Sequence, residues 1–162
     1  PKSSLKKFIG KNARIIHSNP QNISKHIKVA DVVVGAVLVH GAKAPKVVTE
    51  KMVKTMKKGS VIVDVAIDQG GSIETSHATT HSDPVFIKHG VIHYCVANMP
   101  GAYPRTSTIA LTNATLPYLI KLIKELDKMD DGFRKGINTH DGFIAYKPVA
   151  EDLRMMDRFR EF

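Results

Sequence analysis

The chain of 162 residues is 43% hydrophobic, which is enough for one globular domain or parts of two. Its longest apolar run, residues 32–39, is far shorter than the roughly 20 residues that cross a bilayer, and no signal-peptide pattern opens the sequence, so we expect a soluble cytoplasmic protein without a membrane partner. The single cysteine, Cys95, excludes an internal disulfide and fits a reducing compartment.

The formal net charge of +9 is concentrated at the start of the chain, because Asp31 and Glu50 are the only acidic residues before Ser60. A basic stretch of this kind can face an anionic cofactor, nucleic acid or only solvent water. The sequence has no RNP motif, no zinc-finger spacing and only 6% aromatic residues. We therefore expect no nucleic-acid partner and interpret the lysines as solvated helix faces.

The first third of the sequence alternates strand and helix patterns. The run ARIIHS, residues 13–18, predicts a short strand, and Pro20 lies near the start of a helix carrying Ile23 and Ile27. Residues 30–39, ADVVVGAVLV, are β-branched and apolar on both faces. That pattern is typical of a central parallel strand that is covered by helices on either side.

A second helix and two more strands follow. An apolar stripe over residues 48–56 predicts a helix that Gly59 ends. Residues 61–66 repeat the buried-strand pattern, a long polar loop runs to about Pro84, and residues 91–97 predict another strand. This order of strands and helices predicts an α/β fold with a parallel sheet.

The last third of the sequence has a different character. Prolines and a glycine within residues 100–104 break regular structure. A long helix should follow, capped by Thr106 or Ser107, and Pro117 inside it predicts a kink or a division. After a polar segment, an amphipathic helix is expected over residues 148–159.

Asp68 is the candidate for chemistry. Ligands of open parallel sheets bind beyond the carboxyl ends of the strands, and three glycine-bearing loops leave such ends here, at residues 37–45, 67–71 and 96–101. Asp68 is the only acid in these loops. A carboxylate at this place orients a ribose hydroxyl or transfers protons; the alternative is a turn aspartate that bonds its own loop backbone.

The histidines do not predict a metal site. His77 and His81 are four residues apart, and so are His89 and His93, but this spacing aims two imidazoles at one ion only on a helix. Here the pairs fall in loop and strand patterns. His93 and Cys95 are interpreted as ordinary sheet residues, because no base near Cys95 in the sequence would activate the thiol.

Several long stretches together resemble a known family. ADVVVGAVLVHGAKAPKVVTEKMVKTMKKGSVIVDVAIDQGG, THSDP and VIHYCVANMPGAYPRTSTIALTNATLPY closely resemble the C-terminal half of bacterial alanine dehydrogenase, and GINTHDGFIAY extends the similarity. The resemblance implies NAD-dependent oxidative deamination of L-alanine to pyruvate and ammonium, in an enzyme that is usually hexameric and whose Rossmann domain is inserted into a discontinuous substrate domain.

The resemblance also implies a division of this chain. Residues 1–103 would be the second part of the NAD-binding Rossmann domain, a doubly wound parallel sheet that lacks its first two strands. Residues 104–162 would hold the crossing helix and the C-terminal part of the substrate domain.

The same resemblance implies the site residues. Asp68 corresponds to the catalytic aspartate beside the nicotinamide ribose, where it assists proton transfers. The cofactor-binding residues that the resemblance implies are Ser18 near the adenosine, Val37, Leu38, Val65, Ala66, Ile67, Asp68, Val96, Ala97, Asn98 and Met99. Apolar strand ends would cover the nicotinamide and exclude water.

The sequence departs from the family in two respects. It contains no G-x-G-x-x-G turn for the cofactor's phosphates, and the family's substrate-binding Lys and Arg and catalytic His belong to a portion outside these residues. We therefore expect the isolated chain to be inactive and to be complemented by that N-terminal portion. The strand at residues 30–39 would keep an unpaired edge that favours self-association.

Two other interpretations stay open. The chain could be the NAD-binding subunit of a transhydrogenase, although Asp68-Gln69 favours the dehydrogenase. It could also be a non-catalytic oligomerisation or binding module. The residues alone leave NAD and NADP undecided, and the family favours NAD.

Overall fold

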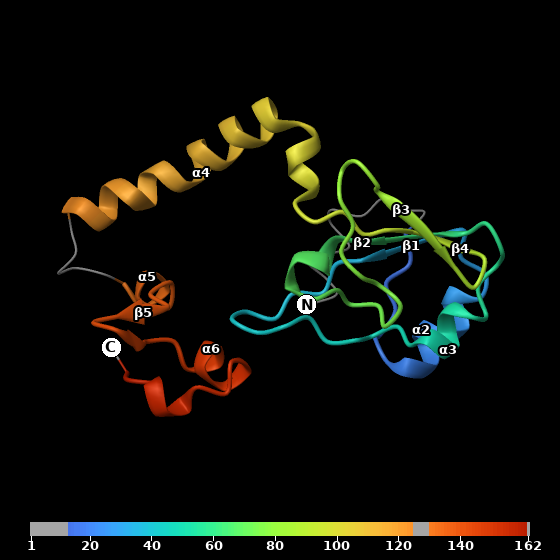
Figure 1. Cartoon of the computed structure of the whole chain (residues 1–162). Helices are drawn as coiled ribbons and strands as arrows, with labels where there is room; N and C mark the ends of the chain where they lie inside the picture. The colour runs from blue at the N-terminus through green and yellow to red at the C-terminus, as the bar shows by residue number, and fades with distance from the viewer. Residues whose placement is uncertain (1–12, 125–129, 162) are drawn as a thin grey trace.

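The computed structural model describes residues 13–124 and 130–161, and the larger of its two sheets has four strands (Figure 1). The strands lie in the order β1 (Val32–Gly35), β2 (Val61–Asp64), β4 (Val91–Tyr94) and β3 (Val85–Lys88). β1, β2 and β4 are parallel, whereas β3 is antiparallel to β4. Parallel strands with helices between them confirm the predicted α/β class.

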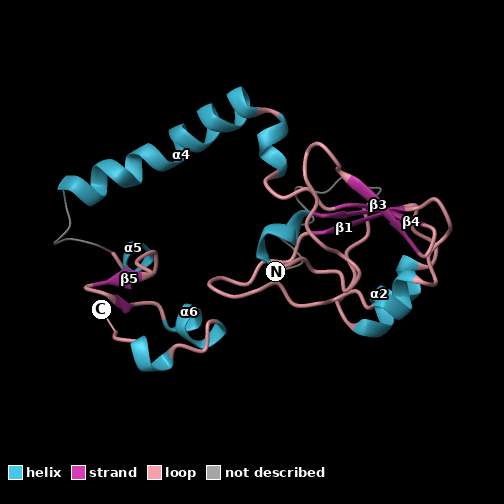
Figure 2. Ribbon diagram, in the orientation of Figure 1, coloured by secondary structure: helices cyan, strands magenta, loops and turns pink. Residues whose placement is uncertain are grey.

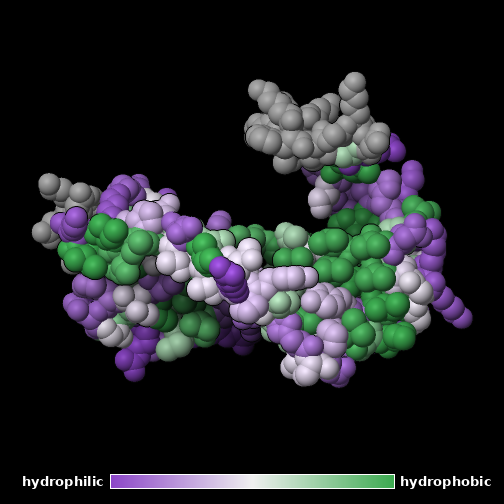
Figure 3. Space-filling view, turned by 90° about the horizontal axis from the view of Figure 1, so that it is seen from above, coloured by the Kyte–Doolittle hydropathy of each residue, from purple (hydrophilic) through white to green (hydrophobic). Residues whose placement is uncertain are grey.

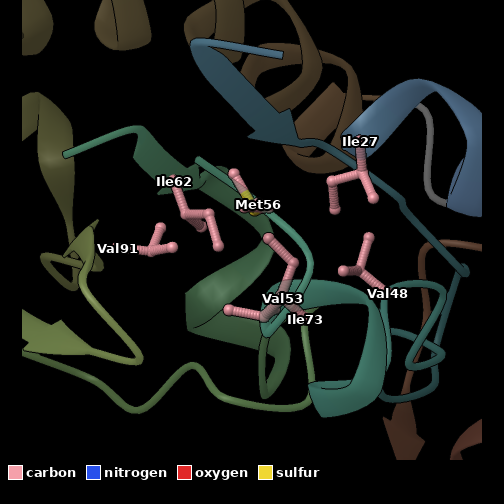
Figure 4. Packing of buried hydrophobic residues seen from close by; sticks show 7 residues of the cluster. All are labelled: Ile27, Val48, Val53, Met56, Ile62, Ile73 and Val91. Atoms are coloured by element: carbon pink, nitrogen blue, oxygen red, sulfur yellow. The ribbon is translucent and has the colours of Figure 1, made fainter. Parts of the chain in front are cut away.

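Helix α2 (Pro20–Ile27) begins at the predicted proline. Asn19 caps it, because its side-chain oxygen accepts from the backbone N–H of Asn22 at 2.7 Å. The helix buries Ile27 in the main core, which lies between the sheet and its helices (Figure 4). The buried residues of this core are Ile27, Val48, Val53, Met56, Ile62, Ile73 and Val91.

Helix α3 (Glu50–Val53) is much shorter than the predicted helix over residues 48–56. The apolar stripe is nevertheless buried as expected, with Val53 fully enclosed and Met56 7% exposed. After α3 the chain continues as turns to Gly59, whose positive φ of 81° ends the segment.

The second face of the sheet has no helix over it in the part of the chain that the structure describes. Val32 and Val34 of β1 are 58% and 60% exposed, and Ile87 of β3 is 71% exposed. Seen from above, hydrophobic side chains gather over the part of the molecule that holds the sheet (Figure 3). The prediction of a central strand at residues 30–39 with helices on both sides is therefore wrong: β1 is an edge strand of four residues.

Two other strand predictions also differ from the structure. Residues 13–18 form no strand, because they pair with no described segment. Strand β3, in contrast, was not predicted. It lies between the polar loop that was predicted to end near Pro84 and the strand that was predicted at residues 91–97. It reaches β4 through the two-residue turn His89-Gly90, whose φ values of 56° and 78° match the twist of a hairpin.

Helix α4 (Pro104–Lys124) leaves the sheet as the long predicted helix, after the short 3-10 helix η2 (Met99–Ala102) (Figure 1). It starts at Pro104, before the predicted caps Thr106 and Ser107, since proline at a helix start gives up no hydrogen bond. Pro117 lies inside α4 and does not divide it, and no residue of α4 is buried.

The C-terminal segment forms small elements (Figure 2). They are α5 (Asp131–Arg134), β5 (Thr139–His140), β6 (Phe143–Ile144), α6 (Lys147–Asp152) and the 3-10 helix η4 (Met156–Arg158). The predicted helix over residues 148–159 is thus only partly formed, and Arg154 interrupts it with a φ of 56°. Within the two described ranges, no helix is long and apolar enough to cross a membrane.

Candidate functional site at the carboxyl edge of the sheet

Three chain segments leave the same edge of the sheet, because β1, β2 and β4 are parallel (Figure 1). Residues 36–47 follow β1, the 3-10 helix η1 (Val65–Gln69) follows β2 directly, and residues 95–98 follow β4 and lead into η2. The predicted site residues from these segments therefore meet at one edge, as sheet topology requires.

Ser18 is the exception among the predicted residues. It is exposed, precedes α2, and lines a separate surface hollow together with Arg14, His17 and Asn22. No hydrogen bond described for this structure joins it to the residues at the carboxyl edge.

The Asp68 carboxylate is exposed on η1 and is tied to the neighbouring segment. Its Oδ1 accepts a hydrogen bond of 3.0 Å from the backbone N–H of Asn98. Asn98 adopts the left-handed conformation, with φ 52° and ψ 54°, which few residues other than glycine and asparagine adopt readily. Asp68 therefore bridges two strand ends, and the interpretation as an aspartate bonded to its own turn does not describe its hydrogen bond.

His81 extends this connection and was not among the predicted site residues. Its Nε2 lies 3.0 Å from the carbonyl oxygen of Asn98, so Nε2 carries the proton that is donated. A Cβ atom at Gly101 would lie 3.2 Å from the same nitrogen. The segment THSDP thus packs against the peptide that binds Asp68. The sequence signal for His81 was that THSDP is one of the stretches that resemble the known family.

A second aspartate, Asp64 at the end of β2, lies beneath η1 and is fully buried. Its carboxylate accepts from the backbone N–H of Ser72 at 2.9 Å, from that of Ile73 at 3.1 Å, and from the Ser72 hydroxyl at 3.1 Å. A buried carboxylate is stable only with such donors. Asp64 therefore fixes the loop that follows η1, a role that sequence reasoning missed because an Asp within an apolar run gives no spacing signal.

Two glycines make room for this carboxylate. A Cβ atom at Gly35 would lie 2.3 Å from the Ser72 hydroxyl oxygen and 3.0 Å from Oδ1 of Asp64. A Cβ atom at Gly71, which has a φ of 76°, would lie 2.9 Å from Oδ2 of Asp64. Any larger side chain at either position would displace the loop.

The other predicted cofactor residues divide by exposure. Ala66, Ile67 and Val96 are 8%, 5% and 0% exposed, so their side chains belong to the layer beneath the edge. Leu38 and Val65 are 58% and 48% exposed, although both are apolar. Ala97 and Asn98 are exposed, while Val37 and Met99 are half-buried. A hollow of 620 Å³ adjoins this edge, and it is lined by Asn98, Pro100, Gly101, Pro104, Ser107, Thr108, Ala110 and Leu111.

The histidines at four-residue spacing have separate partners. His77 stacks on Phe86 with ring centroids 3.9 Å apart, and Phe86 stacks on His93 at 4.7 Å. His93 is fully buried between the Thr75 hydroxyl, 2.8 Å from Nε2, and the Val91 carbonyl, 3.0 Å from Nδ1. Burial lowers the pKa of His93, so the neutral ring donates from Nδ1 and accepts at Nε2.

The sequence of this chain matches a known protein family. The model of the family described as "Alanine dehydrogenase/PNT, C-terminal domain" matches residues 1–147. The chain belongs to this family. The family membership also confirms the resemblance on which the site residues were predicted.

Individual alanine dehydrogenase/PNT relatives agree. The alanine dehydrogenase of Lysinibacillus sphaericus is 53% identical over 152 residues, covering 91% of this chain and 41% of the relative. Alanine dehydrogenase 2 of Staphylococcus aureus strain USA300 is 54% identical over 156 residues, covering 93% and 42%. The chain therefore spans about two fifths of the length of these relatives.

Solved structures support a Rossmann-type fold. An L-alanine dehydrogenase superposes with a TM-score of 0.76 at 42% identity, covering 94% of this chain and 43% of the other. A transhydrogenase from Sinorhizobium meliloti superposes with a TM-score of 0.67 at 25% identity, covering 90% and 39%. The transhydrogenase is thus the more distant of these two neighbours.

Proposed function

We propose that this chain supplies the nicotinamide side of the active site of an NAD-dependent alanine dehydrogenase. The observation that carries the proposal is the Asp68 carboxylate, exposed at the carboxyl edge and held by the Asn98 N–H. In the complete enzyme, L-alanine, water and NAD would give pyruvate, ammonium, a proton and NADH. NAD, when bound, accepts the hydride.

In this proposal the chain's own residues hold the reacting groups and exclude water. Leu38 and Val65 are apolar yet exposed beside the ends of β1 and β2, which suits a flat ring laid across the edge. Asp68 accepts and returns protons while the imine of alanine is hydrated and ammonium is released. Ala66, Ile67 and Val96 support the edge from below.

We further propose the division predicted above, with the Rossmann part at residues 1–103 and the substrate-domain part at residues 104–162. The phosphate-binding turn and the substrate clamp would come from the family's N-terminal portion, so the isolated chain would neither bind NAD tightly nor turn over. The exposed valines of β1 support this proposal, since that edge and face require a covering partner.

That partner would be the N-terminal portion or, without it, a second copy of the chain, and the complete enzyme would be a homo-oligomer. The expected cytoplasmic location stays a prediction.

The transhydrogenase alternative is weaker, because identity to the superposed transhydrogenase is 25%, against 42% for the superposed alanine dehydrogenase. The segment Asp68-Gln69 also favours the dehydrogenase. A non-catalytic oligomerisation module is favoured by the same bare edge and face, and the experiment below separates it from the enzyme.

The test is a chimera in which this chain replaces the matching segment of the Lysinibacillus sphaericus alanine dehydrogenase. We expect alanine-dependent reduction of NAD by the chimera and none by the isolated chain. Asp68→Asn in the chimera should lower kcat by about 100-fold or more, the range of general acid–base catalysis. Asp31→Asn, exposed directly before β1 at the opposite end of the sheet, is the matched control and should leave kcat unchanged. An Asp68→Asn chimera with full activity would refute the assignment.

A further inference from the structure

The loop that follows Asp68, residues 69–73, is bonded along its length to the segment at residues 44–47; we name it the glycine loop. The N–H of Ala44 donates to the carbonyl of Gln69 at 2.9 Å, and the N–H of Val47 donates to the carbonyl of Ser72 at 2.8 Å. These two backbone bonds hold the ends of the glycine loop. The carbonyls between these two bonds, those of Gly70 and Gly71, accept hydrogen bonds from another donor.

That donor is the side chain of Lys46. Its ammonium group lies 2.5 Å from the carbonyl oxygen of Gly70, 2.8 Å from that of Gly71 and 3.5 Å from that of Ile73. A lysine ammonium carries three N–H donors, so one side chain can satisfy this set of carbonyls. Bonds from a charged donor are roughly twice as strong as neutral ones.

The two central carbonyls belong to the turn that ends η1. Gly70 and Gly71 have φ values of 89° and 76°, and their N–H groups donate to the carbonyls of Ile67 and Ala66, each at 2.9 Å. These bonds hold the N–H side of the turn, and Lys46 binds its carbonyls. Since Asp68 lies two residues before Gly70 on the same turn, Lys46 adds a second restraint to the backbone that carries the carboxylate.

We propose that Lys46 is a positioning residue for Asp68. Through the carbonyls of Gly70 and Gly71 it holds η1 in the orientation in which Asp68 meets the N–H of Asn98. For catalysis the proposal rests on the proposed function, whereas the ordering of the loop stands independently of it.

The effect of removing Lys46 should be local. Asp64 continues to bind the N–H groups of Ser72 and Ile73, so the far end of the glycine loop stays attached to β2. Lys46→Met keeps the apolar stem of the side chain and deletes the donors. Lys46→Arg retains a charged donor and should restore most of the order.

The first experiment measures amide hydrogen exchange residue by residue in the full 162-residue chain. Lys46→Met should speed exchange at Gly70, Gly71 and Asn98 by about tenfold, and should leave Ile62 and His93 unchanged. Lys43→Met, three positions earlier in the same segment, is the matched control and should leave all five amides unchanged. Unchanged exchange at Asn98, or equal acceleration across the sheet, would overturn the proposal.

The second experiment measures steady-state kinetics in the chimera described above. Lys46→Met should lower kcat by about tenfold with KM for L-alanine within about twofold, and Lys46→Arg should recover most of the loss. A rise of KM alone, or no change, would overturn the catalytic part. An inactive parent chimera would instead refute the proposed function, and hydrogen exchange would still decide the role of Lys46 in ordering Asp68.

Discussion

Two aspartates four positions apart should differ sharply in what they contribute to stability. Asp64 is fully buried and accepts from two backbone N–H groups and one hydroxyl, all from Ser72 and Ile73. Asp68 is exposed, and its hydrogen bond comes from the N–H of Asn98. Replacing each by alanine therefore removes very different sets of interactions.

The expected magnitude follows from the donors left behind. Asp64→Ala leaves two buried N–H donors without their acceptor, whereas the Ser72 hydroxyl can rotate. Each unpaired N–H group costs about 1–3 kcal/mol, so a loss of about 2–6 kcal/mol is expected. Asp64→Asn should cost less, about 1–2 kcal/mol, because its amide oxygen can still face the two N–H groups while its NH₂ group donates to the Ser72 hydroxyl. Asp68→Ala should cost less than about 1 kcal/mol, since water replaces its exposed bond.

Urea unfolding followed by circular dichroism measures these differences. With an m-value of about 2 kcal/mol per molar, Asp64→Ala should lower the midpoint by about 2 M, and Asp68→Ala by less than about 0.5 M. The m-values should agree among the variants. Equal midpoints for the two alanine variants, or a more stable Asp64→Ala variant, would refute the role assigned to the buried carboxylate.

Three other predictions test the core and the bare edge. Burial lowers the pKa of His93, so the folded chain binds a proton at this ring less readily than the unfolded chain does. The free energy of unfolding should therefore fall as the pH drops below about 6.5. Urea titrations at several pH values measure this dependence, and His93→Gln should flatten it. Burial also raises the pKa of the Cys95 thiol, which is fully enclosed, so iodoacetamide should label the folded chain about 100-fold more slowly than the chain in urea; equal rates would contradict the packing. Val34, 60% exposed on β1, should promote self-association of the isolated chain, and Val34→Lys should weaken it in sedimentation experiments, whereas an unchanged association constant would exclude this strand as the contact.

Hydrophobic pattern predicted those parts of the fold that depend on local chemistry. The start of α2 was found from Pro20, and the apolar stripe around α3 is buried, because both depend on neighbouring residues. The strand predicted at residues 13–18 failed for the opposite reason: alternation favours a strand only where another strand is present to pair with it, and none of the described segments pairs there. β3 was missed even though His89-Gly90 between two apolar runs is a hairpin signal.

The strand ends that form the candidate site were predictable from the sequence. The side chains that hold these strand ends in place were not. Sheet topology alone brings the segments around Asp68 and Asn98 together. The supports depend on side chains that act over long sequence distances: Lys46 reaches carbonyls 24 to 27 positions away, and His81 reaches one 17 positions away. No local spacing encodes such contacts.

The edge of β1, which no described segment pairs, and the missing parts of the proposed cofactor site are connected. Parallel strands end at the same edge of a sheet, so a strand that paired in parallel with β1 would place its own terminal loop beside Val37 and Leu38. That single event would pair the free edge of β1 and add a further loop to the carboxyl edge of the sheet, where Asp68 lies. Self-association of the isolated chain through β1 should therefore compete with complementation by the N-terminal portion. Adding that portion should dissociate the self-associated species in the same titration in which NADH binding appears. If NADH binding appeared while the self-associated species persisted unchanged, the two functions of this edge would have to be separate.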